Sequence, residues 1–263
     1  MSVMHWLKAV VIAFSSYSQI PMPQLKWDDE AMKVAIAFLP LVGLVMGGIV
    51  WAWLWLCSLL ELNAVLFAAV TCVLVVLITG GIHMDGFADT ADALAAHQDQ
   101  KRSLEIMKDP HLGAFAMIRF FVYLLLYFAL LNQLYELGWA SSIVFIFLAA
   151  RCFGAWSTIT MANARKEGFL VAFTQTASKS AVGIVLVVFN LVALVGMVWM
   201  SWPGALAALV LSLGVTLWYR RLARRRFGGA TGDTTGFYIQ MIELALLAGV
   251  LLGQQVWLLL SIG

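Results

Sequence analysis

The sequence predicts an all-α membrane protein, a bundle of about seven transmembrane helices whose N-terminus faces the cytoplasm. Composition supports this: 63% of the 263 residues are hydrophobic and only 11% are Asp, Glu, Lys or Arg, whereas soluble domains carry roughly a quarter of charged residues. The apolar runs are also long enough to cross a hydrocarbon core, which takes about 20 residues. A net charge of +2 gives no reason to expect nucleic-acid binding. We therefore treat residues 1–263 as one integral membrane domain.

The elements follow in order along the chain. Residues 6–14 form a short apolar stretch without a convincing cleavage site after it, so residues 1–36 are predicted to be an N-terminal interfacial segment rather than a signal peptide. Gly43 and Gly47 have the spacing that lets membrane helices approach closely. The predicted spans cover residues 37–60, 64–82, 115–134, 139–161, 179–200, 202–219 and 237–260.

The basic residues predict the orientation, because Lys and Arg are retained on the cytoplasmic side of a membrane. Fourteen of the sixteen lie before the first span or in the connections after the second, fourth and sixth spans. The other connections and the C-terminal tail contain none. The N-terminus is therefore expected in the cytoplasm and the C-terminus outside, which in a bacterium would make the membrane the cytoplasmic (inner) one.

The connection between the second and third spans, residues 83–114, is predicted to be a cytoplasmic acidic catalytic loop. On a helix, Asp85, Asp89 and Asp92 fall within a stripe about 60° wide. Three like charges crowded together need a cation, and carboxylates suit Mg²⁺ or Mn²⁺. The alternative is a solvated helix with an acidic face. The small alanines between the aspartates and the adjoining membrane helix favour a metal site.

Further polar residues lie on the same predicted side. Lys108 and His111 precede the third span, where free N–H groups attract phosphate, although a lone histidine such as His111 or His83 is more often a hydrogen-bonded surface group. A glycine-rich segment precedes the last span. It contains Asp233, a candidate metal ligand or base, and the candidate phosphate contacts Gly232 and Thr234.

Charged residues within the spans are costly and therefore informative. Arg151 lies inside the fourth span, Glu243 lies six residues into the last one, and Arg165 follows the fourth span. Contacts to substrate or phosphate are one interpretation. An ion pair between Arg151 and Glu243 that only fixes helix packing is the other. Their position on one side favours a cytoplasm-facing cavity.

Acidic metal ligands, basic phosphate partners and a glycine-rich segment suit the transfer of a phosphoryl-linked group from a nucleotide-activated donor to an alcohol. Asp85, Asp89, Asp92 and Asp233 are the candidate catalytic residues. An ion or cobalt transporter is the alternative class, but the halves of the chain show no repeat. Enzymes that transfer phosphatidyl groups from CDP-linked donors to alcohols use related chemistry, but Ile82 stands where their signature needs an aspartate.

Four segments together resemble the cobalamin synthase (adenosylcobinamide-GDP ribazoletransferase) family. They are residues 79–92, 105–113, 164–169 and 232–236. The similarity extends over nearly the whole chain. Gln19, Gln240 and His111 stand where family members often have Arg, Glu and Arg.

The resemblance implies a Mg²⁺-dependent membrane enzyme that joins α-ribazole, or its 5′-phosphate, to adenosylcobinamide-GDP through the ribazole 5′-oxygen. GMP would be released and adenosylcobalamin, or its 5′-phosphate, would form. Asp85, Asp89 and Asp92 carry over as metal ligands, with Asp233 opposite them. Other enzymes of cobalamin assembly are candidate partners beside the lipid bilayer, and the sequence leaves the oligomeric state open.

Overall fold

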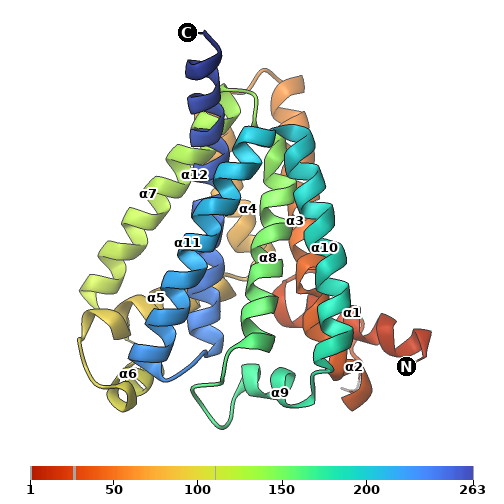
Figure 1. Cartoon of the computed structure of the whole chain (residues 1–263), viewed down its shortest axis with the longest axis vertical. Helices are drawn as coiled ribbons and strands as arrows, with labels where there is room; N and C mark the ends of the chain where they lie inside the picture. Colours follow the sequence, from red (N-terminus) through yellow and green to blue (C-terminus); the bar gives the residue numbers. More distant parts are fainter. Residues whose placement is uncertain (1, 26–27, 110, 263) are drawn as a thin grey trace.

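A computed structural model describes residues 2–25, 28–109 and 111–262. Helices account for nearly all of the regular structure in those ranges, and the extended backbone there is limited to one isolated bridge. The long helices run side by side, and the chain ends lie at opposite ends of the bundle (Figure 1). The predicted all-α helical bundle is therefore confirmed.

Within the described ranges, six helical segments are long and apolar enough to cross a membrane, and a seventh is counted if one bent pair of helices is a single span. The predicted number of spans is thus confirmed. The long helices are α3 (Leu39–Leu59), α7 (Ala114–Glu136), α8 (Ile143–Thr160), α10 (Lys179–Met200), α11 (Trp202–Phe227) and α12 (Gly232–Ile262). The bent pair is α4 (Ala64–Thr79) and α5 (Ile82–Ala95). The shorter helices are α1 (Val3–Tyr17), α2 (Asp29–Ala35), α6 (Gln100–Ile106) and α9 (Phe169–Thr176).

The first span begins earlier than its apolar run. Helix α2 continues into α3 through one 3-10 turn, Ile36–Phe38, so the helical segment extends from residue 29 to residue 59. Acidic residues and Lys33 in α2 interrupt the hydrophobic pattern without ending the helix. The interfacial position of residues before this helix stays a prediction.

The second span ends earlier than expected. Gly80 and Gly81 adopt φ values of 64° and 75°, a left-handed conformation that glycine accepts without steric cost. They turn the chain by 94° between α4 and α5. The backbone N–H of Gln19 donates to the carbonyl oxygen of Ile78 at 2.7 Å, so the segment after α1 packs on this turn. Helix α5 therefore lies across the end of the bundle, at a steep angle to α4 (Figure 1). We call this end, which also carries α1, α6 and α9, the site end.

Helix α8 is the centre of the bundle and is buried along most of its length, whereas α7 and α10 bury only a few of their residues. Gly43 and Gly47 of α3 pack directly on α8, and a Cβ atom at Gly47 would lie 2.7 Å from the Cα of Val144. Side chains at these two positions would force the helices apart. The packing role predicted for these glycines is confirmed.

Candidate active site

The aspartates of α5 meet the start of α12 because two glycines let the helices touch. A Cβ atom at Gly86 would lie 2.8 Å from the carbonyl oxygen of Asp233, and one at Gly236 would lie 3.2 Å from that of His83. Backbone contact at these positions leaves no space for larger residues. Asp233 is thereby held beside the helix that carries Asp85 and Asp89.

The four predicted carboxylates differ in their surroundings. Asp85 is exposed, whereas Asp89, Asp92 and Asp233 are half-buried. Asp92 packs against the start of α7, where a Cβ atom at Gly113 would clash with its carboxylate. Burial and then the negative charges of the other three aspartates raise the pKa of Asp89 to about 7. The group thus behaves as one cluster of repelling charges.

Arg165 forms an ion pair with this cluster. Its Nη1 lies 3.4 Å from Oδ2 of Asp233, and its Nη2 donates to the carbonyl oxygen of Leu104 at 3.3 Å. The loop after α8 is fixed by backbone bonds to the segment before α12: Ala230 donates to Ala162 at 2.8 Å, and Ala164 donates to Ala230 at 2.9 Å. The two predicted segments around residues 165 and 233 are therefore brought together.

A cavity of about 200 Å³, which we call the acidic cavity, opens beside the cluster. Asp85, Asp233 and His83 line it together with Tyr17 of α1. The expectation that His83 is a surface group is wrong: its side chain is buried, and its ring lies 6.2 Å from that of Tyr17. Burial, followed by the charge of Arg151, lowers the pKa of His83 to about 3, so this imidazole is neutral at pH 7.

A second hollow, the basic pocket, lies between α6 and the loop after α8 and has a volume of about 390 Å³. Its charged lining comprises Lys101, Glu105, Lys108, Arg165, Lys166 and Glu167. Arg165 connects it to the acidic cavity through Asp233. The sequence indicated Lys108 and Arg165. It missed Lys101 and Lys166, because positive charge on this side also has a topological explanation.

His111 lines neither of these two hollows. Its side chain is 91% exposed, and its Nδ1 and backbone nitrogen lie 2.8 and 2.9 Å from Oδ1 of Asp109. These hydrogen bonds hold the pKa of Asp109 below its usual range. A phosphate contact by His111 stays a prediction that this arrangement does not favour.

Thr234 stabilises the start of α12. Its hydroxyl accepts a hydrogen bond from the backbone N–H of Thr231 at 2.8 Å, and its own backbone N–H donates to the Thr231 hydroxyl at 3.1 Å. This reciprocal pair resembles a capping box. Thr234 is buried, whereas Gly232 is exposed and lines the acidic cavity. The cap therefore orients Asp233, and Gly232 remains the better candidate for contact with a ligand.

Arg151 and Glu243 lie in the interior of the bundle. They form an ion pair and are 1% and 0% exposed, and the Tyr127 hydroxyl donates to Glu243 at 3.1 Å. Neither residue lines the acidic cavity. The structure shows the packing pair that the sequence offered as one alternative, and a substrate contact by either residue stays a prediction.

The four aspartates have suitable chemistry for Mg²⁺, which prefers oxygen ligands. Within the described ranges, however, no three Asp, Glu, His or Cys side chains are close enough together to hold one ion. Mg²⁺ is commonly held by one or two carboxylates together with substrate phosphates. The donor set therefore fits an ion that arrives with a phosphorylated substrate better than a permanent metal centre.

Comparison with known proteins identifies the family. A model of the cobalamin-5-phosphate synthase family matches residues 9–251. The adenosylcobinamide-GDP ribazoletransferase of Lachnoclostridium phytofermentans is 38% identical over 241 residues, which cover 92% of each chain. The protein of the same name from Pseudomonas entomophila is 37% identical over 246 residues, 92% of this chain and 97% of the relative. No solved structure matches this chain. The chain belongs to the cobalamin-5-phosphate synthase family.

Proposed function

We propose that this protein is an adenosylcobinamide-GDP ribazoletransferase, which joins α-ribazole or its 5′-phosphate to adenosylcobinamide-GDP and releases GMP. The observation that carries the proposal is the position of Asp233, which faces the aspartates of α5 on one side and Arg165 of the basic pocket on the other. Phosphoryl transfer from a diphosphate needs this combination of positive charge and oxygen ligands. The family relationship favours this function over a transporter or a phosphatidyl-alcohol transferase.

The basic pocket supplies a binding site for the diphosphate and the guanosine end of the donor. Lys101, Lys108 and Lys166 can neutralise phosphate oxygens, and Arg165 can reach both the phosphates and Asp233. The acidic cavity then receives the acceptor. Tyr17 and His83 offer ring surfaces there on which the flat base of α-ribazole can stack.

The attacking atom follows from atom balance. A ribose hydroxyl of α-ribazole forms a bond to the phosphorus that carries the cobinamide, and the bond from this phosphorus to GMP breaks. When the acceptor is the 5′-phosphate, that group remains on the product, so its 5′-oxygen is not free to attack. One mechanism that serves both acceptors therefore uses a different ribose hydroxyl, which corrects the 5′-oxygen expected from the sequence. The hydroxyl proton passes to a carboxylate of the site.

One or two of the carboxylates of Asp85, Asp89, Asp92 and Asp233 would hold Mg²⁺ together with the phosphates of the donor. When bound, the ion would neutralise charge on the diphosphate and on the departing GMP. The chain itself holds Asp233 in place through Arg165 and through the Thr231–Thr234 cap. We also propose that the site end faces the cytoplasm, because the basic connections lie there and nucleotide-activated donors are made in that compartment.

The test is a GMP-release assay on the protein in liposomes, with the corrinoid donor and α-ribazole, with and without Mg²⁺. We expect metal-dependent turnover that falls at least about 100-fold in Asp85→Asn, as when charge stabilisation by a metal is lost. Turnover that survives chelation would refute the metal assignment. Absence of GMP from a correctly folded wild-type protein would refute the function.

A further inference from the structure

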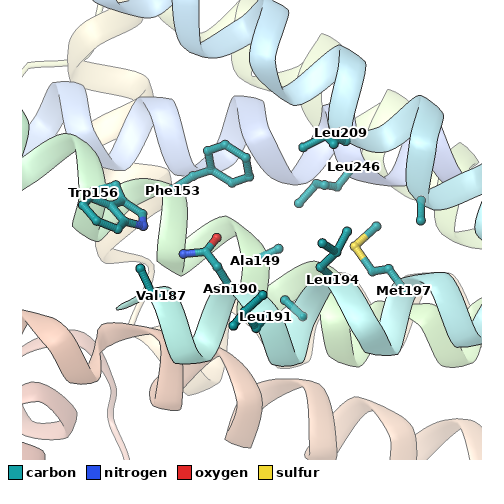
Figure 2. Close-up of a pocket in the computed structure, with 12 residues that line it drawn as sticks. Ala149, Phe153, Trp156, Val187, Asn190, Leu191, Leu194, Met197, Leu209 and Leu246 are labelled. Carbon is teal, nitrogen blue, oxygen red and sulfur yellow. The ribbon is translucent and has the colours of Figure 1, made fainter. Parts of the chain in front are cut away.

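A cleft between α8, α10 and α11 lies on the lipid-facing side of the bundle, away from the active site. Helices α10 and α11 meet near Ser201 and separate toward the site end, with α8 behind them (Figure 1). The inner part of this cleft is an apolar cavity of about 250 Å³. Its wall includes Phe153, Trp156, Val187 and Leu194, and Asn190 is its polar side chain (Figure 2). Such a surface suits a hydrocarbon chain.

The cleft continues toward the site end into a polar cavity of about 240 Å³. Phe153 and Trp156 line both cavities and so connect them. The remaining lining of the second cavity is polar: Ser157, Thr160, Thr216, Tyr219, Arg220 and Tyr238. The cleft thus has an apolar cavity at one end, and hydroxyl groups and a guanidinium line the cavity at the other end.

Arg220 is available to an external anion. Its Nη2 donates to the Thr160 hydroxyl at 2.6 Å, and within the described ranges no carboxylate lies within 4 Å of its guanidinium. A guanidinium has five N–H donors, so most remain for a ligand. Arginine binds phosphate through two parallel hydrogen bonds. An arginine without a carboxylate partner, with hydroxyl groups beside it, therefore has the donors that a phosphate group needs.

The depth of Arg220 matches the phosphate level of a bilayer. Trp202, which is exposed and packs edge-on against Trp257, marks the opposite membrane surface. Along α11, the 18 residues from Trp202 to Arg220 span about 27 Å, close to the hydrocarbon thickness of about 30 Å. The apolar cavity then lies at the depth of the acyl chains.

We propose that this cleft binds one anionic phospholipid, with its phosphate on Arg220 and an acyl chain in the apolar cavity. The cleft changes from apolar to polar toward the site end, as a phospholipid changes from its acyl chains to its head group. A free phosphate would use only the polar cavity and would leave the apolar cavity empty. The site requires no substrate of the proposed reaction, so it stands or falls separately from that function.

The test is native mass spectrometry of the full-length protein in detergent, titrated with phosphatidylglycerol or phosphatidylcholine. We expect one phosphatidylglycerol per chain, bound at least about tenfold more tightly than phosphatidylcholine. Arg220→Gln is expected to weaken this binding about tenfold, whereas Arg220→Lys keeps most of it. Arg221→Gln is the matched control, because Arg221 is an exposed neighbour whose loss changes the net charge equally.

The apolar part is tested in the same way with neighbouring valines of α10. Val187→Trp fills the cleft and should weaken binding, whereas Val188→Trp, on an exposed position outside the cleft, should not. Equal losses in the two arginine variants or in the two valine variants would overturn the proposal. So would displacement of the lipid by millimolar inorganic phosphate, or a delipidated protein that binds both lipids equally.

Discussion

Charged side chains are paired with opposite charges in the bundle interior, whereas at the site end charges of one sign predominate. In the interior, Arg151 meets Glu243, and each charge has a partner of opposite sign. At the site end, the aspartates of α5 and α12 crowd together, and Arg165 is the one basic side chain that forms an ion pair with them in the described part of the chain. A matched buried pair is tolerated for packing. An unmatched cluster costs free energy, and such clusters occur mainly where a ligand compensates for them. The excess of one sign, rather than depth in the membrane, therefore marks the functional site.

Removing one partner of the interior pair should have the largest effect on stability. Glu243→Gln leaves the Arg151 guanidinium buried without an opposite charge. The free energy of unfolding should fall by about 3–5 kcal/mol, as for other broken buried pairs. Thermal unfolding in detergent measures this loss. Turnover per folded molecule should change little, since neither residue lines the acidic cavity.

A double variant provides the control. Arg151→Met combined with Glu243→Gln removes both charges, and it should recover a large part of the stability that Glu243→Gln loses. If the single variants are stable but inactive, the pair belongs to the catalytic machinery and the comparison is wrong.

The site end should respond in the opposite sense. Asp89→Asn removes a candidate metal ligand, so turnover should fall about 100-fold, equivalent to about 2.7 kcal/mol. It also removes one of four carboxylates that repel one another, so the protein should become no less stable. The sign follows from the raised pKa of Asp89: the ionised form is disfavoured in the folded protein at pH 7. GMP release and thermal unfolding, measured on the same preparation, test both parts.

Glu136→Gln is the matched control, because Glu136 is exposed at the opposite end of the bundle. It should change neither activity nor stability. A fall in the unfolding temperature of Asp89→Asn would show that this carboxylate is a structural partner rather than an uncompensated charge.

Much of this architecture was predictable because lipid imposes long apolar runs. The fifth span, residues 179–200, was predicted at its observed limits. Two boundaries differ for physical reasons. The charged residues of α2 interrupt the apolar pattern but not the helix, and the paired glycines at 80 and 81 end α4 inside a continuous apolar run. Hydropathy reports burial in lipid, and it does not report backbone direction.

The site was predictable in part. The spacing of the aspartates on α5 and the Gly-Asp-Thr segment indicated carboxylates at one end of the bundle. Which partners meet depends on tertiary contacts that local patterns do not encode. Arg165 reaches Asp233 through a backbone bridge between distant loops, whereas His111, with a similar local setting, turns to Asp109.

The contact between α5 and α12 can be tested at Gly86. A Cβ atom there would lie 2.8 Å from backbone of Asp233, so Gly86→Ala must shift one helix. We expect a loss of about 1–3 kcal/mol in stability, as in other overpacked contacts, and about tenfold lower turnover from misplaced carboxylates. Gly48→Ala is the control: no atom lies within 4 Å of its added Cβ, and alanine is the better helix former.

The smallest expected effect on stability concerns Arg165. Its pair with Asp233 is partly exposed, with side chains 24% and 29% accessible, so Arg165→Gln should cost less than about 1 kcal/mol. The KM for the GDP-activated donor should rise about tenfold, because a phosphate contact of the basic pocket is lost, while Arg224→Gln, an exposed change on α11, leaves KM unaltered. If kcat falls and KM does not, Arg165 acts by holding Asp233 rather than by binding the donor. The Arg165–Asp233 ion pair would then have a structural role, as the Arg151–Glu243 pair has in the interior.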